Sequence, residues 1–296
     1  MRVAVTGASG LIGSALVADL RSKGHQVVAL VRGPSRGPDQ FQWDPMAGSI
    51  DLSPLAGIDA VVHLAGAGIG DRRWTEGYKE TIRDSRLVGT RTLAGAIAAL
   101  DPPPSVFISG SAVGYYGDTG DTAVDETAPP GSGFLADVVV AWEAAAQPAR
   151  AAGIRVVHPR TGLVISGRGG AWSRMWPLFQ LGLGGKFGSG RQWWSFISLR
   201  DEVAALEHLL TDLEGPVNLT APSPATNAEI TSAMGRLLKR PTLLQVPAPV
   251  LAVVLGEMSE GVLGSIRAIP ARLQSSGFVF RDPTIDAALA YARAAR

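Results

Sequence analysis

The first part of the chain repeats one pattern, in which a short apolar run precedes a longer segment with apolar residues at helical spacing. Arg2–Thr6 is the first such run, and Leu11–Lys23 carries its apolar residues on one helical face. Gly24 closes this helix, and Gln26–Val31 forms the next apolar run. The pattern therefore predicts a strand, a helix and a second strand in the first 31 residues.

The same two spacings recur further along the chain. Strands are predicted at Phe41–Trp43, Ala60–Leu64, Ser105–Ser109, Arg155–Val157 and Val217–Thr220. Helices are predicted at Tyr78–Ala99, Asp137–Ala152 and Asp201–Leu213. Strands that alternate with helices form βαβ crossovers, and the crossover helices cover both faces of a parallel sheet. We therefore predict an α/β fold with a doubly wound parallel sheet.

The composition and the pattern of predicted elements change after about residue 165. Gly167–Gly170 and Gly182–Gly190 are rich in glycine, four tryptophans crowd residues 172–194, and helical patterns dominate from Pro222 onward. We interpret this as a smaller, mainly helical C-terminal domain that is built from two segments of the chain and lies over the edge of the sheet. The predicted division is residues 1–165 plus about 199–221 for the main domain, and 166–198 plus 222–296 for the smaller one.

Composition narrows the class of protein. The 296 residues are 46% hydrophobic and include no cysteine, which excludes disulfides and thiolate metal sites. A net charge of +1 gives no reason to expect nucleic acid as a partner, and the four histidines lack metal-ligand spacing. The run Val250–Leu255 is too short to span a membrane, and no signal peptide precedes the first strand. We expect a cytoplasmic monomer or homodimer with a small-molecule substrate and no metal.

The strongest motif is the glycine turn Thr6–Gly13, which follows the first strand and opens the first helix. Gly7 permits the tight turn, Gly10 lets a pyrophosphate approach the backbone, and Gly13 lets helix and strand pack closely. The helix N-terminus then offers free N–H groups to the phosphates. The glycines are spaced three and three, rather than the two and three of the standard dinucleotide fingerprint. The context predicts a dinucleotide site; the alternative is a glycine turn without a ligand.

The end of the second predicted strand bears on the choice of cofactor. An acidic residue there accepts from the ribose hydroxyls of NAD, whereas an arginine accommodates the 2′-phosphate of NADP. Residues Val31–Arg36 contain no acid, and Arg32 follows the strand directly. This contrast predicts NADP, with NAD less favoured; the alternative is a solvated basic loop.

Several dispersed segments resemble the extended short-chain dehydrogenases/reductases, the relatives of sugar-nucleotide epimerases and dehydratases. The resemblance rests on Thr6–Gly13, His63–Gly66, Ser109–Gly117, and Gly188–Gln192 through Asp201. An atypical branch, the uncharacterised "epimerase family" proteins, resembles the chain more closely. Its signatures match at Arg73-Trp74, Asp84–Arg86, Trp142–Ala145, Gly182–Gly185 and Ala221–Asn227, and its C-terminal domain matches Pro247–Leu289. The resemblance implies a Rossmann core with a bound dinucleotide.

The resemblance also implies roles for individual residues. Gly7, Ser9, Gly10, Leu11, Ile12 and Gly13 would hold the pyrophosphate; Arg32 the 2′-phosphate; Asp44 the adenine amino group; and Leu64, Ala65 and Gly66 the adenosine side. Further cofactor positions are Arg86, Ser109, Pro159, Arg160 and Leu163, the last three in the segment that typically touches the nicotinamide carboxamide. Arg73, Trp74, Gln192, Trp193 and Trp194 would line the substrate pocket. For Arg86, a salt bridge on the helix surface is the alternative.

The catalytic pair of ordinary family members is missing. Those enzymes use Tyr-x-x-x-Lys on the helix after the serine strand, where the lysine lowers the pKa of the tyrosine. Residues 134–143 form that segment here and contain neither type. Ser111, Tyr115 and Tyr116 are the remaining candidates for acid–base work; alternatively the tyrosines only pack. Arg73, Arg160 and Arg200 are candidate activating cations.

Two functions remain open on this basis. The first is an NADP-dependent oxidoreductase or epimerase-like enzyme acting on a small carbonyl or a sugar-nucleotide-like substrate. The second is a catalytically idle NADP-binding protein that senses redox state or binds a partner. Polar groups facing the nicotinamide would favour the enzyme, whereas an apolar plug there would favour the binding protein.

Overall fold

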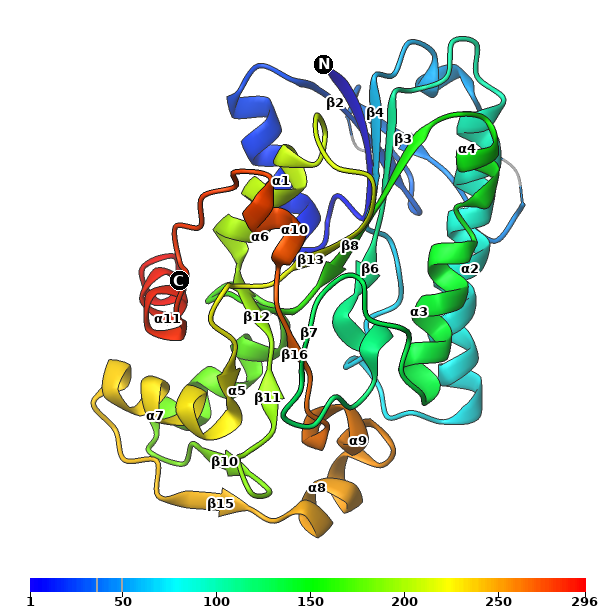
Figure 1. The fold of residues 1–296 in the computed structure, drawn as a ribbon. Helices are drawn as coiled ribbons and strands as arrows, with labels where there is room; N and C mark the ends of the chain where they lie inside the picture. The colour runs from blue at the N-terminus through cyan, green and yellow to red at the C-terminus, as the bar shows by residue number, and fades with distance from the viewer. Residues whose placement is uncertain (36, 49) are drawn as a thin grey trace.

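The computed structural model describes residues 1–35, 37–48 and 50–296, so Arg36 of the basic loop lies outside the described residues. Its centre is a parallel sheet with the strand order β13-β8-β5-β4-β1-β2-β3 (Figure 1). The strands are β1 (Arg2–Thr6), β2 (Gln26–Val31), β3 (Gln40–Gln42), β4 (Ala60–His63), β5 (Val106–Ser109), β8 (Arg155–Thr161) and β13 (Gly215–Leu219), and the short β6 (Ser111–Ala112) extends the pairing to β8. This topology confirms the predicted α/β fold, because every pair in the sheet is parallel.

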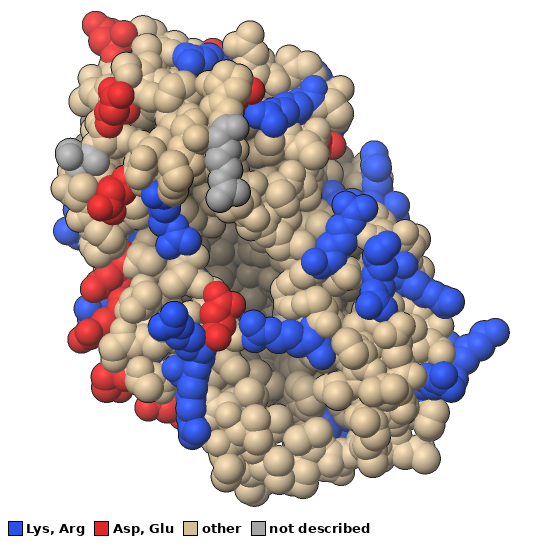
Figure 2. Space-filling view, turned by 180° about the vertical axis from the view of Figure 1, so that it is seen from behind, with Lys and Arg blue, Asp and Glu red and all other residues tan. Residues whose placement is uncertain are grey.

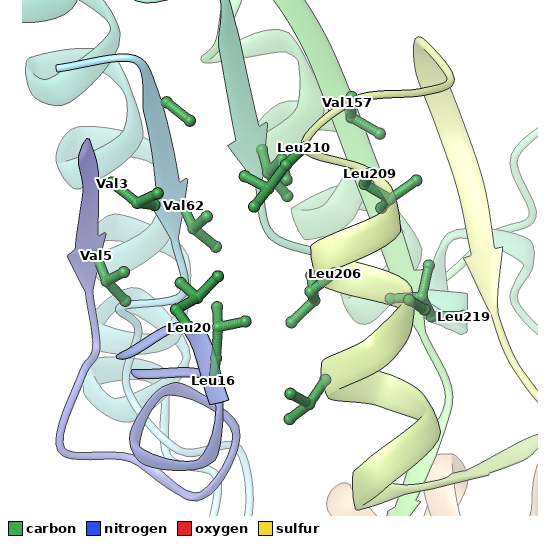
Figure 3. Close-up of a cluster of buried hydrophobic side chains, with 14 of the residues drawn as sticks. Val3, Val5, Leu16, Leu20, Val62, Val157, Leu206, Leu209, Leu210 and Leu219 are labelled. Carbon is green, nitrogen blue, oxygen red and sulfur yellow. The ribbon is translucent and has the colours of Figure 1, made fainter. Parts of the chain in front are cut away.

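Helices cover both faces of the sheet. α1 (Leu11–Ser22) and α6 (Leu199–His208) pack on one face, and α2 (Glu76–Ala98), α3 (Phe134–Ala144) and α4 (Gln147–Ala151) lie on the other (Figure 1). Figure 3 shows Leu16 and Leu20 of α1 facing Leu206 of α6 over the strand residues Val5 and Val62. These fully buried apolar side chains fix the first helix, and with it the glycine turn, against the sheet.

Two predicted helices are shorter than their patterns suggested. The single helix expected at Asp137–Ala152 is interrupted between α3 and α4, where Pro148 occupies the first turn of α4. Proline lacks the N–H that a continuing helix needs, but it fits a helix start. The helix expected to reach Leu213 ends at His208, and Leu213 adopts a left-handed backbone with φ of 62°.

The rest of the chain forms a smaller lobe below the sheet in Figure 1. Its elements are β9 (Leu163–Ile165) paired with β12 (Phe196–Ser198), α5 (Gly170–Gln180), β10 (Gly185–Phe187) paired with β15 (Leu244–Val246), β11 (Trp193–Trp194) paired with β14 (Ala225–Thr226), α7 (Asn227–Leu238), α8 (Ala248–Leu255), α9 (Met258–Leu263), β16 (Arg267–Ala268) paired with β7 (Ala123–Val124), and α11 (Ile285–Ala294). α10 (Ala271–Ser275) instead packs against β13 of the main sheet. Trp172 and Trp176 are the largest side chains in its core. Among the described residues, no helix has the length and apolarity needed to cross a bilayer.

The carboxyl ends of the sheet strands point toward the smaller lobe (Figure 1). Seen from behind, a deep hollow runs between the two lobes, and Lys, Arg, Asp and Glu side chains stand on its lower lip (Figure 2). In open α/β sheets, ligands bind outside the carboxyl ends of the strands. The hollow is therefore the place to examine for a site.

Candidate functional site

Contacts inside the protein require two of the three glycines in the glycine turn, and the third is less constrained by them. Gly7 has a φ of 69°, and a Cβ there would lie 2.8 Å from the Leu64 carbonyl. A Cβ on Gly13 would overlap the Gly7 carbonyl oxygen. A Cβ on Gly10 would meet only that same oxygen, at 3.2 Å. Packing within the protein therefore demands Gly7 and Gly13 more strongly than Gly10, which leaves room for a ligand at Gly10.

The first turn of α1 suits an anion. Gly10 is its N-cap, no side chain caps the helix, and no acidic residue lies in the first turn. The backbone N–H groups of Leu11, Ile12 and Gly13 belong to the first turn, where an α-helix leaves its donors unpaired. By contrast, α2 is capped by the Thr75 side chain and has Glu76 in its first turn. The free donors and the helix dipole of α1 fit a pyrophosphate.

Thr6 joins the turn to the end of β4. Its hydroxyl oxygen accepts hydrogen bonds from the backbone N–H groups of Leu64 and Ala65, both at 3.2 Å, and lies 2.7 Å from Nδ1 of His63. Burial lowers the pKa of His63 to about 4, so the imidazole is neutral at neutral pH. Thr6 and His63 thus hold the segment Leu64–Gly66 beside the turn. No role was predicted for Thr6 or His63 individually, although both are polar residues at the ends of apolar strands.

The structure places Arg32 and Asp44 close together at neighbouring strand ends. Arg32 directly follows β2, and the Trp43 N–H donates to the Val31 carbonyl at 2.9 Å. Arg32 is exposed, and among the described residues its guanidinium has no ion-pair partner. The Asp44 Oδ1 accepts from the Met46 N–H at 2.8 Å, and within the described residues its second carboxylate oxygen has no partner. This arrangement fits an adenosine with a 2′-phosphate.

Arg86 is a half-buried cation that reaches from α2 toward the strand ends. Its Nη1 donates to the carbonyls of Ala67 and Ile82, each at 3.0 Å, and its guanidinium lies 5.1 Å from the ring centre of Trp142. Burial lowers the pKa of Arg86 to about 10. Within the described part of the chain, no carboxylate pairs with it, so the salt-bridge alternative is not what the structure contains. A desolvated guanidinium without a counter-charge fits an anionic ligand.

A buried ion pair lies at the carboxyl ends of β6 and β8. Arg160 donates from Nε and Nη2 to the two carboxylate oxygens of Glu143, at 2.8 and 3.0 Å, and the Ser111 hydroxyl donates to the same carboxylate at 2.6 Å. Burial opposes the charged form of Glu143, but Arg160 outweighs it and holds the pKa of that carboxyl below its usual value. The two groups therefore stay ionised.

The two candidate tyrosines have different surroundings. Tyr116 is only 3% exposed, its hydroxyl donates to Oδ1 of Asn218 at 2.7 Å, and Arg160 donates to it at 3.0 Å. Burial raises the pKa of Tyr116. Tyr115 is half-buried, and the Arg160 guanidinium lies only 3.4 Å from its ring centre. Among the described residues, no hydrogen-bond partner of the Tyr115 hydroxyl is present.

The helix that lacks the usual catalytic pair presents an apolar wall to this turn. A Cβ on Gly114 would lie 3.6 Å from Leu135 and 4.0 Å from Val139 on α3. Phe134 at the start of α3 meets Trp74 edge to face, with ring centres 5.3 Å apart. The wall beside the tyrosine turn therefore offers no proton donor from these positions.

Other predicted cofactor residues lie within the sheet or at its end. Ser109 is fully buried, and among the described residues its hydroxyl has no partner. Pro159 is buried in β8, and Leu163 begins β9 with its N–H bonded to the Ser195 carbonyl. Arg160 is engaged by Glu143, so its side chain is committed to the ion pair rather than free for a ligand.

The predicted substrate-pocket residues use their polar groups to tie segments together. The Trp193 indole donates to Asp121, the Trp194 indole to the Val262 carbonyl, the Trp74 indole to the Ile69 carbonyl, and the Gln192 amide to the Phe187 carbonyl. Arg73 lies against Gly256, where a Cβ would be 3.0 Å from its Nε. The structure thus connects Arg73 with the C-terminal lobe.

Comparison with known proteins places the chain in a family. The model of the NAD dependent epimerase/dehydratase family matches residues 3–219, and that of a domain of unknown function, DUF1731, matches residues 246–292. The chain is 48% identical over 293 residues to an epimerase family protein of Mycobacterium bovis, covering 98% of this chain and 97% of the relative. It is 37% identical over 296 residues to the human epimerase family protein SDR39U1, covering 98% of each chain.

Solved structures agree with this placement. The crystal structure of human SDR39U1 (isoform 2) with NADPH has a TM-score of 0.91 at 36% identity and covers 99% of both chains. A nucleoside-diphosphate sugar epimerase from Corynebacterium glutamicum has a TM-score of 0.83 at 36% identity, covering 99% of this chain and 58% of that one. The motif-based resemblance is confirmed: the chain belongs to the NAD dependent epimerase/dehydratase family and carries the DUF1731 domain toward its C-terminus.

Proposed function

We propose that this protein binds NADP(H) in the hollow between its lobes and reduces or oxidises a small carbonyl or alcohol there. The uncapped start of α1, the exposed Arg32 and the unpaired Arg86 support the cofactor, because each offers positive charge or donors to a phosphate. The NADPH in the crystal structure of human SDR39U1, a relative at 36% identity, supports the same choice. When bound, the nicotinamide would supply or accept the hydride.

The observation that carries the catalytic proposal is the contact between Arg160 and Tyr115. Carbonyl reduction needs a proton at the substrate oxygen, and a phenol beside a fixed cation is a known solution. Here the guanidinium lies 3.4 Å from the Tyr115 ring centre, and Glu143 holds it there through two hydrogen bonds. We assign Tyr115 as the proton donor and acceptor and Arg160 as the cation beside it. Tyr116, with its hydroxyl engaged and buried, is a positioning residue.

Ser111 has a defined part in this scheme. Its hydroxyl proton is given to Glu143 at 2.6 Å, so the oxygen offers lone pairs rather than a proton to a bound molecule. It can accept a hydrogen bond from a donor on the substrate other than the reacting hydroxyl, whose single proton is exchanged with Tyr115. Ser111 would therefore help to orient the substrate.

The wall of α3 bears on the substrate class. Phe134 and Leu135, both half-buried, offer apolar surface where a sugar would need hydrogen-bond partners. Leaving a sugar hydroxyl unpaired in a closed site costs about 1–3 kcal/mol. A small carbonyl compound with an apolar body is therefore our preferred substrate over a sugar nucleotide.

The same wall favours a second candidate function. If the apolar side chains of α3 fill the space beside the nicotinamide, the protein would bind NADP(H) without turning over a substrate. Such a protein would sense redox state or bind a partner according to the cofactor form.

The test is NADPH oxidation with a panel of aldehydes, ketones and quinones, followed by Tyr115→Phe on any substrate found. We expect kcat to fall by about 10²–10⁴ with little change in KM, because the hydroxyl alone is removed. Tyr291→Phe, on α11 of the other lobe, is the matched control. Full turnover and an unchanged pH profile in Tyr115→Phe would overturn the assignment, and no oxidation across the panel favours the binding protein.

A further inference from the structure

A pocket lies on the smaller lobe where three helices end together. α5, α7 and α11 finish at residues 180, 238 and 294, and a cavity of about 460 Å³ lies among their last turns. Its lining consists of Trp176, Gln180, Leu238, Arg240, Arg293 and Arg296. The flank that carries α11 in Figure 1 is at right in Figure 2, and Lys and Arg side chains gather there.

Three exposed arginines, Arg240, Arg293 and Arg296, line this one pocket. Arg240 donates from Nε to the Gln180 carbonyl at 2.9 Å, and Arg293 donates from Nη1 to the Leu237 carbonyl at 2.9 Å. Arg296 lies over the ring of Trp176, 5.1 Å from its centre. Among the described residues, none of the three has a carboxylate within ion-pair distance; the nearby acid Asp286 pairs with Arg236 instead.

The helix ends account for only part of this charge. The C-terminus of a helix carries roughly half a negative charge, so three ends together offset about one and a half of the three positive charges. Part of this offset comes from the hydrogen bonds by which Arg240 and Arg293 donate to carbonyls at the helix ends. About half of the positive charge in the pocket is therefore left to solvent or a ligand, as far as the described residues go.

The remaining donors are suited to an oxyanion. A guanidinium has five N–H donors, and the contacts named above use one from Arg240 and one from Arg293. Paired N–H groups on planar forks match the geometry of phosphate oxygens. The floor residue Trp176 is 1% exposed, so it offers little ring surface for stacking. The volume exceeds that of a bare ion and falls in the range of small-molecule sites.

We propose that this pocket binds a phosphorylated small molecule, held by its phosphate through Arg240, Arg293 and Arg296. It is separate from the hollow between the lobes. α5 starts against Leu11 of the glycine turn, where a Cβ on Gly170 would lie 3.3 Å from that leucine, and ends at the pocket. An eleven-residue helix is about 16 Å long, so the two sites occupy opposite ends of α5.

The test is calorimetric titration with two probes, inorganic phosphate and glycerol 3-phosphate, at constant ionic strength. The protein is saturated with NADPH, so that neither probe binds at the glycine turn. We expect saturable binding of both probes, tighter for glycerol 3-phosphate, with Kd at least tenfold higher in Arg240→Gln and in Arg293→Gln. Arg293→Lys keeps the charge but loses the fork, and it should fall between Arg293→Gln and the unmutated protein.

Arg91→Gln is the matched control, because Arg91 is an exposed arginine on α2 of the other lobe. Its Kd should equal that of the unmutated protein. Circular dichroism identifies any variant that has lost its fold. If a glutamine variant is unfolded, the Kd of Arg293→Lys is used instead. The proposal is overturned if neither probe binds saturably, if chloride gives the same response, or if folded arginine variants keep their affinity. Binding of inorganic phosphate without glycerol 3-phosphate would also overturn it, because the site would then take only a free ion.

Discussion

Glu202 offers a quantitative test of the structure near the end of β8. It lies in the first turn of α6 and is fully buried, and its Oε1 accepts a hydrogen bond from the Thr161 hydroxyl at 2.8 Å. Among the described residues, its second carboxylate oxygen has no partner. Burial raises the pKa of Glu202 from 4.5 to about 8, and the Thr161 contact opposes this only in part. The side chain is therefore protonated in the folded protein at neutral pH.

The magnitude follows from linkage. In the unfolded chain Glu202 releases its proton near pH 4.5, whereas in the folded protein it keeps the proton until about pH 8. Between these values the folded state binds more protons, so the free energy of unfolding falls as pH rises. Each pH unit is worth about 1.4 kcal/mol, so the total loss is about 5 kcal/mol. From pH 6.5 to 8 the expected loss is about 2 kcal/mol.

The perturbation is Glu202→Gln, which keeps the shape and removes the titration. The assay is urea unfolding between pH 6.5 and 9, a window in which His63 and His158, with pKa values of about 4, are neutral in the folded state. In the unfolded chain an ordinary histidine is still half protonated at pH 6.5, but this titration is common to both proteins and cancels in the difference between them. The free energy of unfolding of the variant should exceed that of the unmutated protein by about 3 kcal/mol at pH 6.5 and by about 5 kcal/mol at pH 9. Glu80→Gln, an exposed glutamate on α2, should leave the slope unchanged. Parallel curves for Glu202→Gln and the unmutated protein would refute the reasoning.

Three further predictions address the site between the lobes. Arg32→Ala should erase most of an at least tenfold preference for NADPH over NADH, measured by fluorescence titration, because a charge-assisted phosphate contact is worth about 1.5–3 kcal/mol; equal affinities in the unmutated protein would contradict this. Gly10→Val should abolish dinucleotide binding while circular dichroism stays unchanged, since inside the protein a Cβ there meets only the Gly7 carbonyl; unchanged affinity in calorimetry argues against the site. Arg160→Leu should lower the free energy of unfolding by about 3–5 kcal/mol, because it leaves Glu143 buried without its counter-charge. Adding Glu143→Leu to Arg160→Leu should restore part of the lost free energy of unfolding. If the two substitutions instead lower it additively, the ion pair between Arg160 and Glu143 does not stabilise the fold as we describe.

The sheet and its glycine turn were predictable because their signals are local. A mainly apolar strand of five or six residues followed by a helical spacing occurs within one βαβ unit. Gly13 is required by its contact with Gly7 inside that unit, and Gly7 by its own φ of 69° as well as by the more distant Leu64. The break between α3 and α4 also has a local cause in Pro148, which the apolar pattern of the segment concealed. Local signals thus fix where the site lies.

The partners within the site were not predictable in the same way. Glu143 meets Ser111 from 32 residues away and Arg160 from 17 residues away, and nothing in either neighbourhood marks the pairing. Tyr115 and Tyr116 are adjacent on one 3-10 turn, so the sequence alone does not tell which hydroxyl is buried. Asn218 of β13 determines that the buried hydroxyl is that of Tyr116, because it accepts a hydrogen bond from this hydroxyl although the two residues are 102 positions apart in the chain. Side-chain choices of this kind depend on the assembled sheet.

The tyrosine turn also bears on how a family member can lose its usual pair without losing its fold. In the ordinary arrangement both catalytic groups stand on the helix after the serine strand, the position of α3. In our proposal the cation is Arg160 on β8, a strand that pairs directly with the serine strand segment β6 through Ser111. Strand ends that are neighbours in a sheet meet at one edge, so a charge can be supplied from β8 as well as from α3. The apolar residues Leu135 and Val139 are then free to pack against the turn, and the proposed site keeps a cation and a phenol in contact although neither comes from the helix.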